Sequence, residues 1–195
     1  MTSFKEFEKT LFRLNTPAKI QDYLDSIPYN KGETAYSAFK AFSLNKAHCL
    51  EGALIAASAL EKRGFQPLLV DLQAVRDEDH VIVPFQIRGN WGAVAKSNFS
   101  GLRYREPVFS SIRELALSYF DHYYNFKRLK SLRYYSAPLD LNKTGLDWKY
   151  SEKPLHKISD LLAKQKKFKL IDARTERELR KADERIFKAG LVGRV

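Results

Sequence analysis

Residues 45–53 read Asn45-Lys46-Ala47-His48-Cys49-Leu50-Glu51-Gly52-Ala53, and this stretch contains the only cysteine of the chain. From Cys49 to about Lys62 the sequence is rich in alanine and leucine, which predicts a helix that is apolar on all sides and therefore buried. Arg63-Gly64 is typical of a helix C-terminus. We therefore expect Cys49 in the first turn of a central helix, where the helix dipole favours a thiolate.

The hydrophobic period changes from helical to alternating after this helix. Residues 67–72 form a short apolar run, and residues 80–87 and 91–98 are expected to pair as a hairpin. His80 opens the first hairpin strand. A thiol at a helix N-terminus followed by a histidine on a strand predicts a nucleophile and its general base, and a nearby imidazole would lower the thiol pKa further. The alternative is that Cys49 is simply a small buried hydrophobe.

The register of the hairpin decides which side chain orients His80. A three-residue loop at 88–90 places Asn98 opposite His80, whereas a two-residue loop at 89–90 places Ser97 diagonally beside it. The first register is favoured because it gathers the apolar side chains on one face of the hairpin. It predicts a Cys-His-Asn arrangement, in which the asparagine side chain orients the imidazole.

Residues 47–54 and 60–70 resemble the core of the transglutaminase-like superfamily. In that family a cysteine opens a helix, the helix ends in a basic-glycine turn, and a strand follows. The next strand begins with the catalytic histidine, matched here by His80, and a tryptophan on the following strand is matched by Trp91, a candidate substrate contact. The resemblance covers residues 45–100. It implies an α+β fold with a papain-like core, in which a central helix packs on a small antiparallel sheet.

The resemblance also implies thiol acyl transfer or amide hydrolysis. The family's aspartate falls where this chain has Ala95, and Asn98 is the expected replacement. Cys49 would attack a carboxamide or ester carbonyl, His80 would accept the thiol proton, and Asn98 would fix the ring. The oxyanion would be held by the backbone N–H of Cys49 and one further donor, for which Asn45 is the side-chain candidate.

The 195 residues are long enough for a large core, and we expect a core domain at residues 1–140 followed by a helical appendage at 141–195. Trp148 is the expected anchor of the appendage. Periodicity and capping signals predict helices outside the central one at residues 3–14, 17–27, 34–43, 111–124, 154–168 and 174–189.

The formal net charge of +11 suggests an anionic partner. The sharpest basic cluster, residues 127–133, is followed by Tyr134 and Tyr135. This pattern fits nucleic-acid binding, but it also fits a helix end whose long side chains lie along the protein surface.

Several classes of protein are excluded or disfavoured. A single cysteine excludes a disulfide framework and a Cys-rich zinc module, and no apolar run approaches the ~18 residues of a membrane span. We predict a cytoplasmic protein without a cofactor or metal, acting on a protein, a peptide or an amide-bearing small molecule. The alternatives are a degenerate binding module of the same superfamily and a basic nucleic-acid-binding protein. The sequence leaves open the substrate, the choice between hydrolysis and transfer, and the oligomeric state.

Overall fold

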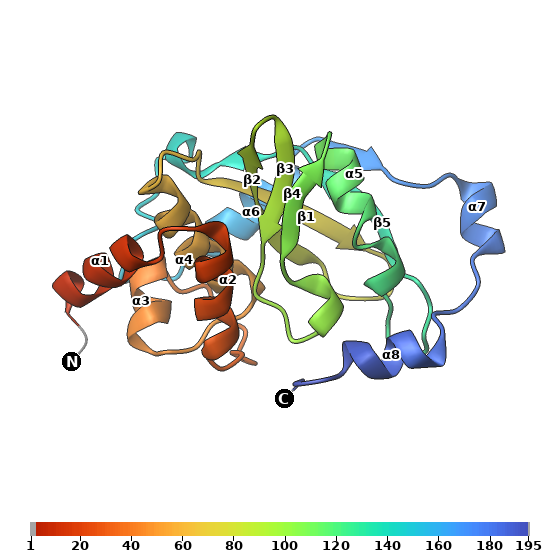
Figure 1. The fold of residues 1–195 in the computed structure, drawn as a ribbon. Coiled ribbons are helices and arrows are strands. Elements are labelled where there is room, and N and C mark those ends of the chain that lie inside the picture. The colour runs from red at the N-terminus through yellow and green to blue at the C-terminus, as the bar shows by residue number, and fades with distance from the viewer. Residues whose placement is uncertain (1–2, 195) are drawn as a thin grey trace.

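The computed structural model describes residues 3–194, and its architecture is α+β, as expected (Figure 1). The strands form a seven-stranded antiparallel sheet in the order β4-β3-β2-β1-β5-β7, with β6 also pairing β1. The strands are β1 (Leu68–Ala74), β2 (His80–Ile87), β3 (Asn90–Val94), β4 (Arg105–Phe109), β5 (Leu132–Ser136), β6 (Leu139–Asp140) and β7 (Lys167–Lys169). The helices are α1 (Phe4–Arg13), α2 (Pro17–Ser26), α3 (Ala38–Ser43), α4 (Cys49–Glu61), α5 (Ile112–Leu117), α6 (His156–Lys164), α7 (Ala173–Glu178) and α8 (Glu184–Gly190).

The central helix predicted from the Cys49 stretch is α4, and the prediction is confirmed. Every residue from Leu50 to Leu60 is buried. The helix ends at Glu61, and the chain turns away at Gly64, whose φ of 83° lies in the left-handed region that glycine tolerates. Because α4 is apolar on all sides, neighbouring elements surround it, and it packs against β2 and the other N-terminal helices.

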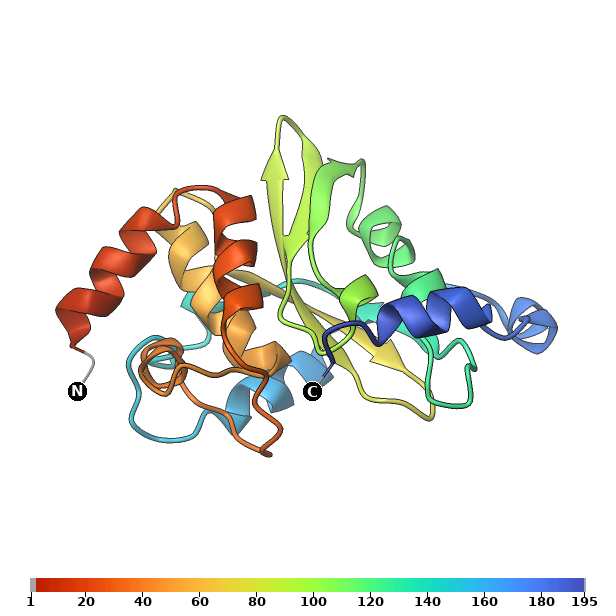
Figure 2. The same cartoon turned by 60° about the horizontal axis from the view of Figure 1, so that its bottom comes forward.

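The sheet separates two apolar cores. The first core lies between the sheet and α4, together with α1–α3 and α6, and the second lies on the opposite face under α5 (Figures 1 and 2). Strand alternation explains the division: Val81 and Val83 of β2 face the first core, whereas Ile82 faces the second.

Capping residues in the sequence correctly predicted where α1 and α2 begin. The Ser3 side chain accepts a hydrogen bond from the Glu6 N–H at the start of α1, and the Thr16 side chain does the same for Lys19 at the start of α2. The next helix begins at Ala38 rather than at residue 34, because Ser37 is its N-cap.

Both predicted hairpin registers were wrong. The observed turn has two residues, Arg88 and Gly89, and Ile87 pairs with Asn90. Both turn residues have positive φ, 51° and 82°, as the tight turn of a twisted hairpin requires. The paired part of β3 ends at Val94, so the ladder does not set Asn98 opposite His80.

The segment after residue 140 differs from the expected helical appendage. It adds the edge strand β7 to β5, and the predicted helix 174–189 is two short helices, α7 and α8. The predicted helix 154–168 is the shorter α6, and 111–124 contains α5 followed by a 3-10 turn, Phe120–His122. The basic cluster 127–133 is not a helix end, since it leads directly into β5.

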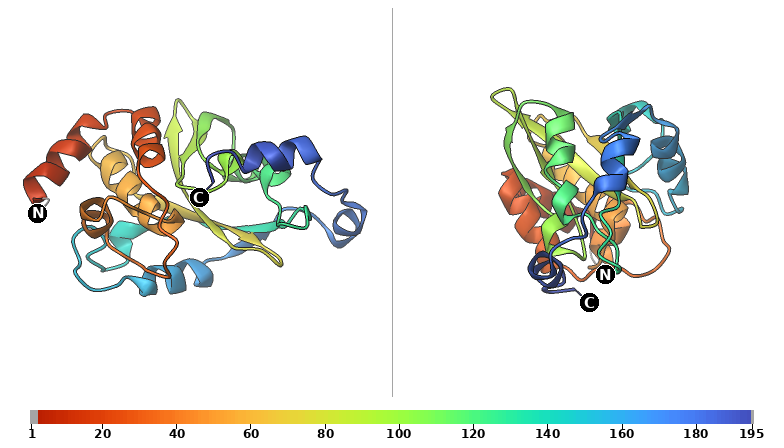
Figure 3. Two further views of the ribbon diagram at one scale, coloured as in Figure 1. Left: turned by 90° about the horizontal axis from the view of Figure 1, so that it is seen from below. Right: turned by 90° about the vertical axis from the view of Figure 1, so that its right-hand side faces the viewer.

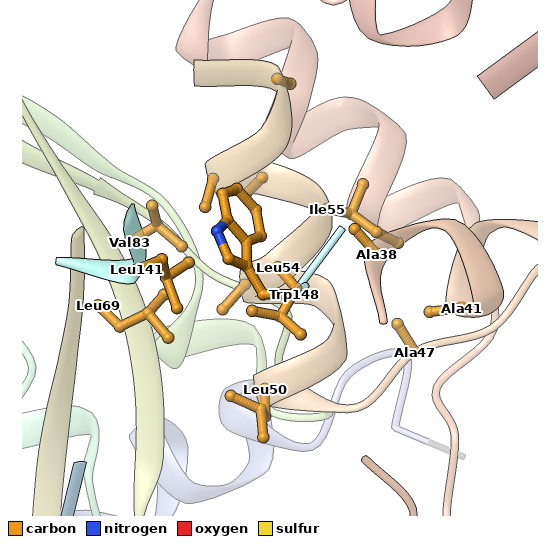
Figure 4. Packing of buried hydrophobic residues seen from close by; sticks show 14 of the residues in the cluster. Ala38, Ala41, Ala47, Leu50, Leu54, Ile55, Leu69, Val83, Leu141 and Trp148 are labelled. Atoms are coloured by element: carbon orange, nitrogen blue, oxygen red, sulfur yellow. The ribbon is translucent and has the colours of Figure 1, made fainter. Parts of the chain in front are cut away.

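Trp148 is buried, with 4% of its surface exposed, and its ring lies between α4 and the sheet (Figure 4). Leu54 of α4 and Leu69 of β1 belong to the same core. The segment after residue 140 therefore contributes to the first core, which contains residues from both sides of position 140.

Replacement of Trp148 by alanine should lower the free energy of unfolding by about 3–5 kcal/mol, because it leaves a large cavity in the first core. Val108→Ala is the control, since Val108 is 67% exposed. Urea unfolding followed by circular dichroism measures both. Equal stability of W148A and wild type would show that the segment containing Trp148 does not support the core.

A second prediction concerns Gly52 of α4, which lies against Lys96. A Cβ at position 52 would overlap the Lys96 Cβ and lie 3.0 Å from its Cγ. Lys96 cannot simply move, because its Nζ donates hydrogen bonds of 2.6 Å to the carbonyl oxygens of Leu24 and Ile27 at the end of α2. Gly52→Ala should therefore cost about 1–3 kcal/mol of stability. Gly32→Ala, where the new Cβ meets only ordinary contacts, should cost less in the same urea titration.

Candidate functional site

A cavity of about 1100 Å³ opens where the amino end of α4 meets the start of β2. Cys49, His80, Ser97 and Asn98 all line it. Chain segments far apart in the sequence complete its wall, namely residues 29–34, 76–80, 97–99, 123–126 and the single residues Leu102, His156 and Arg194. The structure thus brings the three predicted catalytic residues to one cavity.

Cys49 is the first residue of α4 and is half-buried. Its position is fixed by a capping box: the His48 side chain accepts from the Leu50 N–H, and the Glu51 carboxylate accepts from the His48 N–H at 3.1 Å. His48 is therefore the N-cap of the helix rather than an exposed loop residue.

Glu51 is fully buried and ties the loop before α3 to this helix end. Its carboxylate accepts hydrogen bonds from the Thr34 hydroxyl at 2.6 Å, the Asn30 side chain at 3.0 Å and the Tyr36 N–H at 3.1 Å. The His48 Nε2 completes the network by donating to the Thr34 carbonyl at 2.6 Å. One wall of the cavity is thereby anchored directly to the residues that position Cys49.

Tyr29 is a site residue that sequence reasoning missed. Backbone hydrogen bonds of Ala47 to Pro28 and of Asn30 to Ala47 hold residues 28–30 beside the segment before Cys49. Tyr29 lines the cavity with Cys49, and burial raises the pKa of its phenol, against the smaller lowering effect of the nearby Cys49 N–H. A tyrosine contributed by a short parallel bridge leaves no signal in the sequence.

His80 is the first residue of β2 and is 5% exposed. His80 pairs with Leu72, a residue of the second core. Paired residues share a face of the sheet, so the His80 side chain leaves the strand on the face opposite α4. Its Nε2 donates to the Leu102 carbonyl at 2.8 Å. Because a carbonyl oxygen only accepts, Nε2 carries the proton in this contact and Nδ1 keeps its lone pair.

The electrostatics of the site differ from the expected thiolate–imidazolium pair. Burial raises the pKa of the Cys49 thiol, although the N–H groups of Val81 and Leu50 act in the opposite direction. Burial lowers the pKa of His80 to about 4, and the Arg105 charge adds to this effect. Moving the proton from sulfur to imidazole is therefore uphill, and the resting pair is neutral.

Asn98 is half-buried, and the hydrogen bond that demonstrably orients His80 comes from the Leu102 carbonyl. Ser97 is buried, and its hydroxyl accepts from the Phe99 N–H at 3.0 Å. An orienting role for Asn98 stays a prediction, as does a direct hydrogen bond between the Cys49 sulfur and His80.

The two weaker candidates lie elsewhere. Asn45 is exposed in the loop after α3, with φ of 50°, and Trp91 pairs with Gln86 and Phe109 in the sheet. Neither residue lines the cavity. Asn45 is not the cap of α4, because the capping position belongs to His48.

Residues 3–194 lack the features of two other classes of site, a metal centre and a membrane span. No group of three or more His, Cys, Asp or Glu side chains in this part of the chain is arranged to hold a metal ion. No helix within these residues is both long and apolar enough to cross a bilayer.

No protein-family model matches the sequence, and no curated protein matches it either. The resemblance to the transglutaminase-like superfamily thus rests on the residues of this chain.

The lowered pKa of His80 predicts a specific acid dependence of stability. Below about pH 6.5 the unfolded chain binds a proton at His80, and the folded protein does not until about pH 4, so folding stability falls as pH drops through this window. The full contribution is about 3 kcal/mol. Asp71, whose pKa burial raises to about 6, acts with the opposite sign in this range.

Comparison with His80→Gln isolates the histidine, because Asp71 is common to both proteins. Between pH 6.5 and pH 4 the wild type should lose more stability than H80Q in parallel urea titrations. Parallel stability curves would show that His80 titrates normally in the folded protein.

Proposed function

We propose that the protein is a thiol-dependent acyltransferase or amide hydrolase in which Cys49 is the nucleophile and His80 the general base. The observation that carries the proposal is that Cys49, at the first position of a buried helix, and His80 line one cavity. The volume of about 1100 Å³ accommodates a peptide segment or an amide-bearing small molecule.

Cys49 and His80 are both neutral at rest, which favours transfer of the thiol proton during attack on the substrate over a thiolate–imidazolium pair formed beforehand. His80 Nδ1 takes the thiol proton as the sulfur bonds to the carbonyl carbon, while Nε2 stays on the Leu102 carbonyl. The amine or alcohol leaves with that proton, giving a thioester, and water or an acceptor amine then releases the acyl group. The Cys49 N–H binds the oxyanion, and the Tyr29 hydroxyl, on the same cavity wall, is the second donor.

A second candidate is a binding module that keeps the cleft without turnover. The neutral resting pair supports it, since transfer of the thiol proton to His80 is uphill in the absence of substrate. A substrate that stabilises the imidazolium, or that closes the cavity, would have to offset this cost.

Acylation of the thiol separates the two candidates. Incubation with p-nitrophenyl acetate should give an acetyl adduct on Cys49 by peptide mass spectrometry, and Cys49→Ser should give none. His80→Ala should slow adduct formation by about 10²–10⁴-fold, the usual contribution of a general base.

His156→Ala is the matched control, because His156 is an exposed histidine that lines the same cavity. It should acylate at the wild-type rate. A slow H156A with a normal H80A would assign the base to His156, and equal rates for wild type and H80A would favour the binding module.

A further inference from the structure

A second cavity, of about 310 Å³, lies beside the first and shares Arg76 and Asn125 with it. Its wall is strongly basic, because Arg76, Lys130 and Arg133 all line it, and Glu176 is the one acidic residue among them. Lys130 and Arg133 belong to the basic cluster 127–133 of the sequence, which the proposed acyl chemistry does not use.

Arg133 is held as a preformed cationic group. Its side chain is only 8% exposed, and Nη1 donates to the carbonyl oxygens of Lys130 at 3.0 Å and Leu132 at 2.9 Å. The Nε is buried and lies 2.9 Å from a Glu176 carboxylate oxygen, yet it has no hydrogen bond of proper geometry within residues 3–194. A buried guanidinium with an imperfectly matched carboxylate is suited to a better-aligned oxyanion.

The other two cations of the wall, Arg76 and Lys130, do not pair with Glu176. Arg76 is exposed and makes no ion pair with any residue between Ser3 and Arg194. Lys130 pairs with the exposed carboxylate of Asp121, outside the cavity wall. Of the three cations of the cavity wall, Arg76 is therefore the one without an ion-pair partner among the described residues.

Glu176 comes from an exposed helix with few attachments to the body of the protein. It lies on α7, of which no residue is buried, and this helix stands out at one end of the molecule (Figures 1 and 3). The segment is anchored on either side, at Leu170, whose N–H donates to the Arg133 carbonyl, and at Ala182, whose N–H donates to the Arg128 carbonyl. Between these anchors the Glu176–Arg133 ion pair links α7 to the rest of the protein. The Glu176 side chain is 39% exposed, and ion pairs open to solvent stabilise only weakly.

We infer that the cavity lined by Arg76, Lys130 and Arg133 is a binding site for an anionic oxygen group, a carboxylate or a phosphate. In the structure, the Glu176 carboxylate occupies the place of that group beside Arg133. Ligand binding displaces Glu176 and releases α7 from the body. The inference does not depend on Cys49 chemistry, although the shared residue Arg76 places the anion next to the larger cavity.

Titration of the protein with sodium phosphate and with disodium succinate, against sodium chloride at equal ionic strength, tests the site by calorimetry. Glu176→Gln should bind one or both anions about tenfold more tightly than wild type, because it removes the competing carboxylate. Glu178→Gln is the matched control, since Glu178 is a carboxylate of the same helix paired only with Arg174. It should bind like wild type.

Arg133→Gln should abolish binding, and Arg76→Gln, at an exposed position that folding does not depend on, should weaken it. Cys49→Ser should leave binding unchanged, which separates this site from the acyl chemistry. A preference for phosphate or for succinate identifies the ligand class. Binding of neither anion by E176Q, or equal binding by E176Q, E178Q and R76Q, would overturn the inference.

Discussion

The arrangement of the candidate site depends on the buried carboxylate of Glu51. A charge removed from water is tolerated only when hydrogen bonds replace its hydration, and Glu51 receives them from the side chains of Thr34 and Asn30 and from two backbone N–H groups. Those donors belong to the loop that lines the cavity and to the N-cap of α4. The same group therefore fixes the start of the helix, and with it Cys49, relative to the cavity wall.

Burial, rather than the helix dipole, decides the protonation state of the site. A helix N-terminus typically stabilises a negative charge by about 0.3–1 kcal/mol at an exposed site, whereas desolvation shifts a buried group by several pKa units. The Cys49 thiol and the His80 imidazole both follow the larger effect, towards their neutral forms. A sequence pattern reveals the helix N-terminus but not how deeply the neighbouring loops bury it. The sequence therefore predicted a thiolate at Cys49, whereas burial favours the neutral thiol.

Features encoded by neighbouring residues could be predicted, and features that arise from distant pairing could not. The all-apolar run after Cys49 indicated a buried helix, and His80 was placed correctly at the start of a strand. The strand β7 is only three residues long, Lys-Phe-Lys, which is too short for its alternation to predict a strand, and it pairs with the edge of β5. The hairpin register failed because Arg88, rather than an asparagine or glycine, takes the first left-handed position of the turn.

Position 95 is where the sequence resemblance would have placed an aspartate, and this chain has an alanine there. Ala95 is fully buried, and its N–H and carbonyl are each bound at 3.0 Å by the Gln21 side chain of α2. The next residue, Lys96, spans from α4 to the end of α2. This packing commits residues 95 and 96 to joining α2 and α4 to the sheet. The imidazole is oriented instead by Leu102, and without a charged partner its pKa stays low. Burial of the imidazole, with the Arg105 charge nearby, thus sets how weak a base His80 is.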